Sequence, residues 1–179
     1  MRKKSLALLV AVVSVLMLAA APVSAQSAST LRDELLKDWL DMQTTLNALA
    51  SVMPEDRYTF KTTPPQRDFA QQILHVANAN VVNLKFLGGS VQAPAIDRAA
   101  RTKADVLRAM NASFDYGAAV IRSQTEASLF EVVPTNAFLG PSSRARVLYF
   151  LLGHSWDVYG QLVVYVRLNG GVPPASDRP

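Results

Sequence analysis

Residues 142–171, SSRARVLYFLLGHSWDVYGQLVVYVRLNGG, carry the pattern that decides the fold. A hydroxyl at Ser142-Ser143 can cap the start of a helix, and Gly170-Gly171 followed by Pro173-Pro174 can end one. Between these signals a stripe of mostly apolar side chains recurs every three or four positions, which predicts one long amphipathic helix. The stripe consists of Val147, Phe150, Leu151, His154, Val158, Leu162 and Tyr165.

A second stripe of this kind lies near the N-terminus and predicts a helix from Ser29 or Thr30 to Pro54. Thr30 offers a capping hydroxyl, and Asp33 stands three positions later in a variant of the capping box. The stripe consists of Leu31, Leu35, Trp39, Met42, Leu46, Leu49 and Met53.

Two further helices are predicted between these. Thr63-Pro64-Pro65-Gln66 offers a cap, a proline at the first helical position and the glutamine of a capping box, and Gly88-Gly89 would end this helix. Thr102, with Asp105 three residues later, would cap the next one. Their stripes are Phe69, Ile73, Ala77, Val81 and Leu84, then Leu107, Met110, Phe114, Ala118 and Ile121.

The segment from Ser123 to Pro141 has no persistent period and is too long for a tight turn. We therefore expect an all-α fold, a four-helix bundle with a long crossover between the third and fourth helices. No segment predicts a strand.

The first 25 residues predict a secretory signal peptide. Arg2-Lys3-Lys4 is followed by an uncharged run from Leu6 to Ala21, and the small residues Val23 and Ala25 precede a cleavage site before Gln26. An uncleaved anchor is the alternative, but the run is shorter than the roughly 20 residues that a spanning helix needs. We expect a domain at 26–179, exported to the periplasm or beyond, with no stable membrane anchor after cleavage.

Charge and cysteine content narrow the classes further. The chain has 18 basic and 14 acidic residues, and cleavage would remove three basic residues and no acidic one, which leaves a net charge of +1. This balance does not indicate a nucleic-acid-binding protein. With no cysteine, the chain can form no disulfide, thiolate metal site or cysteine nucleophile of its own.

Two histidines are the residues best suited to bind a metal ion or a ligand. His75 and His154 both stand mid-helix among apolar residues, at positions expected to face inward. A buried neutral imidazole needs partners for both ring nitrogens. Each could be a core residue satisfied by a neighbour, or the two could bind a metal ion or a ligand.

The last helix resembles that of the DinB-like family (unrelated to the polymerase of that name). The segment His154-Ser-Trp-Asp-Val-Tyr-Gly-Gln161, followed by the Gly-Gly-Val-Pro-Pro ending at 170–174, is similar to the family's final helix. Arg67-Asp-Phe-Ala-Gln-Gln-Ile-Leu-His75 places a histidine where the family has its first metal ligand. The likeness covers essentially the whole chain after the signal peptide.

The resemblance implies a four-helix bundle, often a homodimer, with a divalent metal such as zinc or nickel held by three histidines. It also implies activity on a small molecule, as in thiol-dependent transferases and isomerases. His75 and His154 match two ligands, but Val158 stands where the third is expected. Asp157 could substitute as a carboxylate ligand, or could be a solvated charge. Gln161 and Tyr159 are expected near the pocket.

Two functional classes therefore remain open. In one, the protein is a divalent-metal-dependent enzyme, thiol-transferase-like, with an incomplete histidine triad. In the other, it is a metal-free bundle that acts as a binding or interaction module.

Overall fold

The computed structural model describes residues 29–176, so the predicted signal peptide lies outside the described residues. Five α-helices and one pair of short strands make up this part, together with three single 3-10 turns. The helices are α2 (Leu31–Val52), α3 (Phe69–Leu84), α4 (Lys103–Arg122), α5 (Glu126–Phe130) and α6 (Arg144–Leu168). The strands are β1 (Val132–Val133) and β2 (Ser142–Ser143), and the 3-10 turns are Glu55–Arg57, Lys85–Leu87 and Pro174–Ser176.

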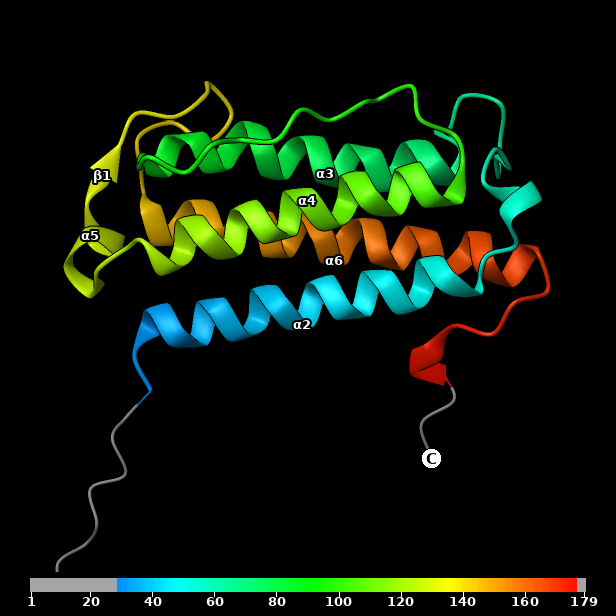
Figure 1. The fold of residues 1–179 in the computed structure, drawn as a ribbon, viewed down its shortest axis with the longest axis horizontal. Coiled ribbons are helices and arrows are strands. Elements are labelled where there is room, and N and C mark those ends of the chain that lie inside the picture. Colours follow the sequence, from blue (N-terminus) through cyan, green and yellow to red (C-terminus); the bar gives the residue numbers. More distant parts are fainter. Residues whose placement is uncertain (1–28, 177–179) are drawn as a thin grey trace, which may run out of the picture.

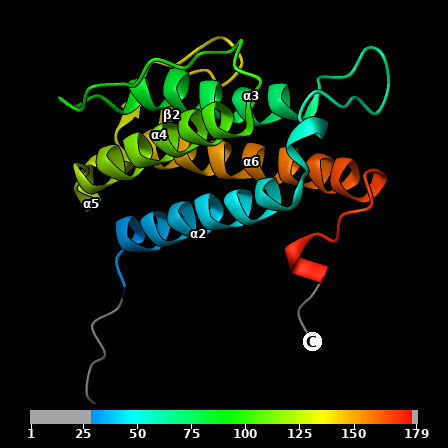
Figure 2. The same ribbon diagram turned by 45° about the vertical axis from the view of Figure 1, so that its right-hand side comes forward.

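The four long helices form a bundle, which confirms the predicted all-α four-helix architecture (Figure 1). α3 and α4 run in the same direction, because Arg101, just before α4, pairs with Asp68, just before α3, at 3.7 Å. α6 runs against α3, since the Tyr165 hydroxyl near its end donates to the Arg67 carbonyl before α3. Figures 1 and 2 show α2 parallel to α6 and opposed to the other two.

The position of the crossover differs from the prediction. The segment that runs the length of the bundle is 88–102, which joins the parallel helices α3 and α4 (Figure 1). The segment from Ser123 to Pro141 joins the ends of α4 and α6 that lie together, so it need not cross. It is long because it contains α5 and β1, and β1 pairs antiparallel with β2 through Val132 and Ser143. This two-residue pairing was not predicted, since so short a strand has no readable period.

Helix starts were predicted correctly in three of the four long helices. The side chains of Thr30, Thr102 and Ser143 each accept a hydrogen bond from the backbone N–H three residues later. The predicted start at Thr63 is wrong, because 63–66 forms a turn closed by Gln66 N–H to Thr63 O at 3.1 Å.

Asp68 is the true cap of α3, in a capping box with Gln71. The first backbone amides of α3 are held by the preceding segment: Phe69 N–H donates to Phe60 O and Ala70 N–H donates to Tyr58 O. These tertiary hydrogen bonds fix where the helix begins, and they are invisible to a local reading of the sequence.

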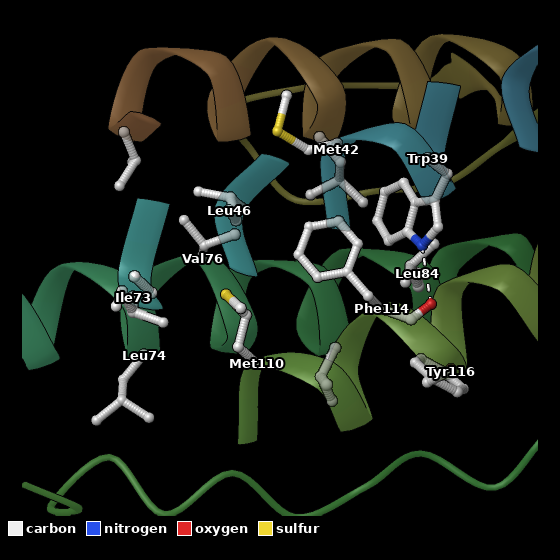
Figure 3. Close-up of a cluster of buried hydrophobic side chains, with 14 of the residues drawn as sticks. Trp39, Met42, Leu46, Ile73, Leu74, Val76, Leu84, Met110, Phe114 and Tyr116 are labelled. Atoms are coloured by element: carbon white, nitrogen blue, oxygen red, sulfur yellow. Dashed lines mark hydrogen bonds between the residues drawn. The ribbon is translucent and has the colours of Figure 1, made fainter. Parts of the chain in front are cut away.

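The core is built on Trp39, which has no exposed surface. Its indole Nε1 donates to the Phe114 carbonyl at 2.8 Å, and the two rings lie 5.0 Å apart between centroids (Figure 3). α4 offers Gly117 beneath the ring, where a Cβ would lie 2.2 Å from Trp39 Cζ2. The close approach of α2 to α4 therefore depends on a bare backbone at this position.

No helix within residues 29–176 is long and apolar enough to span a membrane.

Candidate functional site

α3 and α6 bring the two histidines together. The ring centroids of His75 and His154 lie 4.8 Å apart, and the ring planes are nearly perpendicular at 86°. Both residues are only half-buried, whereas the sequence predicted that they face inward. The difference arises because Ile73, Ala77 and Leu84 occupy the core side of α3, which leaves His75 at the margin of the α3–α6 interface.

His154 is enclosed on one side by an aromatic ring. Phe150, one turn earlier on α6, stacks on the imidazole with centroids 6.2 Å apart and planes 9° from parallel. The Nε2 atom of His154 is buried and has no hydrogen-bond partner among the described residues. An unsatisfied buried ring nitrogen costs free energy, so this atom is suited to a ligand or ion that would pair with it.

Both imidazoles are held in the neutral form at pH 7. Burial is the largest cause and, together with the electrostatic effects of Arg67, His154 and Arg98, it lowers the pKa of His75 from 6.5 to about 4. Burial also lowers the pKa of His154, against the opposing effect of the Asp157 carboxylate. Neutral imidazole is the form that can accept a hydrogen bond or bind a metal ion.

Neither Val158, at the expected position of the third ligand, nor the neighbouring Asp157 completes a metal site with the two histidines. Val158 is 2% exposed and belongs to the hydrophobic core, and its isopropyl group carries no lone pair. Asp157 is exposed, and its Oδ2 accepts a hydrogen bond from Gln161 Nε2 at 3.1 Å. Within residues 29–176, no three His, Cys, Asp or Glu side chains cluster closely enough to hold a metal ion. The residues present therefore do not fit the three-ligand centre that the family resemblance implies.

Gln161 links the two helices beside the histidine pair. Its Oε1 accepts from Gln72 Nε2 on α3 at 2.8 Å, and Gln72 has no exposed surface. Gln161 thus fixes the register of α6 against α3 and also orients Asp157. Tyr159, predicted to lie near the pocket, instead makes an edge contact with Trp156, with centroids 5.5 Å apart.

Each histidine lines a different open cavity. A cavity of about 740 Å³ beside His154 lies over α6 and the start of α2, and it includes Asp157, Trp156, Phe150 and Asp38 in its wall. A cavity of about 430 Å³ beside His75 lies between the start of α3 and the segment before α4. The second is lined by Arg67, Gln71, Leu74, His75, Arg98, Ala99 and Arg101.

The arginines around His75 and the stacked Phe150 were not predicted as site residues. Arg98 and Arg101 come from the end of the crossover segment, and no spacing in the sequence shows that this segment returns to the start of α3. Phe150 could have been found, because it lies four residues before His154 on the same predicted helix face.

Solved structures of low sequence identity share this fold. A DinB-like protein from Bacillus cereus superposes with a TM-score of 0.69 at 15% identity, over 78% of this chain and 93% of that one. The DinB-like protein YjoA from Bacillus subtilis gives 0.64 at 15% identity, over 82% and 99%. YfiT from Bacillus subtilis, described as a probable metal-dependent hydrolase with an unusual four-helix bundle topology, gives 0.64 at 12% identity, over 85% and 94%.

None of the curated proteins matches the chain significantly. The sequence profile of the DinB superfamily does match it, over residues 38–162. The matched region runs from the first turns of α2 into α6 and includes both histidines. The predicted family resemblance is thereby confirmed, and the chain belongs to the DinB superfamily.

Proposed function

We propose that the protein is an exported small-molecule-binding member of the DinB superfamily whose site is the His75–His154 pair without a complete metal centre. The observation that carries the proposal is the pair itself: two neutral imidazoles 4.8 Å apart, with Val158 buried where a third ligand is expected. Two imidazoles alone bind a divalent metal weakly compared with the three or four ligands of protein zinc sites.

The pair is better suited to binding than to proton transfer. A general base works best when its pKa lies near the operating pH, and burial brings the pKa of His75 down to about 4. A neutral imidazole offers one donor and one acceptor, and the buried Nε2 of His154 has no hydrogen-bond partner among the described residues. These features favour recognition of a small polar molecule.

A metal-dependent enzyme is the second candidate, and two observations favour it. The neutral imidazoles are in the ligating form, and YfiT, which shares the fold, is described as a probable metal-dependent hydrolase. In this alternative, zinc or nickel would be held by His75 and His154. Asp157 or water would complete the set, leaving a position for a small thiol in thiol-transferase-like chemistry.

Metal analysis of protein purified without an affinity tag separates the two candidates. The proposal predicts far less than one equivalent of zinc or nickel per chain. A full equivalent that is lost in the His75→Ala variant, with the fold retained, would contradict the proposal and support the enzyme. Calorimetric titration with Zn²⁺ and Ni²⁺ gives the affinity directly in both proteins.

We also propose that the protein is exported and that it forms a homodimer. Export is supported by the cationic start and apolar run of the first 25 residues. The homodimer that the family resemblance implies is open to a measurement of molar mass by light scattering.

A further inference from the structure

The cavity beside His75 concentrates positive charge. Its wall contains the side chains of Arg67, Arg98 and Arg101, together with Gln71 and His75. No carboxylate among the described residues lines it. Like charges gathered around one concave surface raise the local concentration of anions, because the low-dielectric walls focus their field.

Arg101 is the structural member of this set. Its Nε lies 3.7 Å from Asp68 Oδ2, and its Nη1 donates to the backbone carbonyls of Arg98 at 3.2 Å and Ala100 at 2.7 Å. Arg101 therefore ties the end of the crossover segment to the start of α3, and in doing so it holds the Arg98 backbone at the rim of the cavity.

Arg67 and Arg98 are the two arginines of the cavity whose side chains can pair with a ligand. Within residues 29–176 neither forms an ion pair, and both are exposed. The neighbouring Asp97 is engaged locally, since its Oδ1 accepts from the Ala99 N–H at 2.8 Å. Two unpaired guanidiniums that line one cavity repel each other, and a bound anion would offset that repulsion.

We infer that this cavity binds a small organic anion, with its carboxylate or phosphate group between Arg67 and Arg98 and the rest of the molecule toward His75. Guanidinium groups suit both anions because their planar fork donates two parallel hydrogen bonds. The volume of about 430 Å³ lies in the range of small-ligand pockets. Leu74 and Ala99 add apolar wall against which the carbon skeleton can pack.

The parallel arrangement of α3 and α4 adds to the positive potential. Both helices begin beside the cavity, so the positive ends of both helix dipoles lie there. The side chains of Asp68 and Thr102 cap these two helices, so a backbone N–H at each start is already paired. The arginine side chains, rather than the helix amides, are therefore the donors offered to the anion.

The inference rests on the proposed small-molecule function and narrows its ligand class. The test is calorimetric titration of the full mature chain at low ionic strength with succinate, inorganic phosphate and neutral succinamide. We expect millimolar or tighter binding of at least one anion and none of succinamide. Arg67→Gln and Arg98→Gln should each weaken anion binding at least tenfold. Arg122→Gln removes the same charge from an exposed position at the far end of α4, and it should leave binding unchanged.

The outcomes separate this inference from the proposed function. Succinate binding without phosphate binding assigns a carboxylate ligand, and the reverse assigns a phosphate. The inference would be overturned if neither succinate nor phosphate binds. It would also be overturned if Arg122→Gln weakens anion binding as much as Arg67→Gln and Arg98→Gln do, because that result indicates a general charge effect. Anion binding that persists undiminished in His75→Ala would support the arginine cavity while counting against a function centred on the histidine pair.

Discussion

The imidazoles of His75 and His154 meet nearly edge to face, 4.8 Å apart, although they come from antiparallel helices distant in the sequence. The meeting depends on the register of α6 against α3, which the Gln72–Gln161 hydrogen bond and the Tyr165–Arg67 hydrogen bond hold. A two-histidine site is thus built into the helix packing, and its third position is closed by Val158.

The depressed pKa of His75 predicts a specific dependence of stability on pH. His75 titrates near pH 4 in the folded protein and near 6.5 in the unfolded chain, so the unfolded chain binds more protons between these values. The free energy of unfolding should therefore fall as the pH is lowered from about 6.5 toward about 4. Chemical denaturation across this range measures it. His75→Gln should show a smaller loss, and an identical pH profile in both proteins would contradict the assignment.

The Gln72–Gln161 pair predicts a non-additive double-mutant cycle. Gln161→Leu leaves the fully buried Gln72 amide without its partner and should cost about 1–3 kcal/mol of unfolding free energy. Replacing both glutamines with leucine removes the unpaired group, so the double variant should lose less than the sum of the two single losses. Strict additivity in urea denaturation would show that the hydrogen bond does not couple the helices.

Substitution by alanine should have opposite effects on stability at two helical glycines, because one lies against Trp39 and the other faces open space. Gly117→Ala would place a methyl group within 2.2 Å of the Trp39 ring, and should destabilise by about 1–3 kcal/mol. Gly160 on α6 has open space around its Cβ position, so Gly160→Ala should stabilise by about 0.5–1 kcal/mol through helix propensity. Thermal melts of the two variants check the signs, and a neutral Gly117→Ala would be inconsistent with the Trp39 packing.

The signal-peptide interpretation predicts a mature N-terminus at Gln26. Mass spectrometry of the protein recovered from the periplasm or medium of an expressing cell measures it. Ala25→Phe, which places a bulky ring where the cleavage site needs a small residue, should block processing. Intact Met1 in the membrane fraction of the wild type would contradict the interpretation.

Most of the fold could be predicted from the sequence because its signals are local. The stripe around Trp39 and the hydroxyl caps at Thr30, Thr102 and Ser143 each depend on residues within one or two turns. The start of α3 could not be predicted, since Thr63 and Asp68 offer similar caps and contacts from Tyr58 and Phe60 decide between them.

Only part of the site could be predicted, because part of it depends on contacts between segments that are distant in the sequence. The helix pattern and the family resemblance pointed to His75 and His154, and the structure brings them together. The arginine cavity depends on the crossover segment lying between α3 and α4, which sequence spacing does not encode. Because the crossover was predicted after the third helix, Arg98 and Arg101 were not identified from the sequence as neighbours of His75.

We propose that Val158 alone separates this pair of histidines from a metal centre. Val158 lies one helical turn after His154 on α6, so Val158→His adds a third imidazole beside the existing two. Val164→His is the matched control, because it adds an imidazole to an exposed position of the same helix. Circular dichroism and the melting midpoint establish that each variant is folded before metal is added.

Calorimetric titration of wild type, Val158→His and Val164→His with Zn²⁺ and Ni²⁺ measures what the missing third imidazole contributes to metal binding. We expect weak binding by the wild type and by Val164→His, and binding by Val158→His that is about 100-fold tighter, equivalent to about 2.7 kcal/mol. The melting midpoint of Val158→His should also rise with added metal, since the ion binds only the folded state. Tight binding already in the wild type, or no gain in folded Val158→His, would show that Val158 is not what keeps the histidine pair from binding a metal ion.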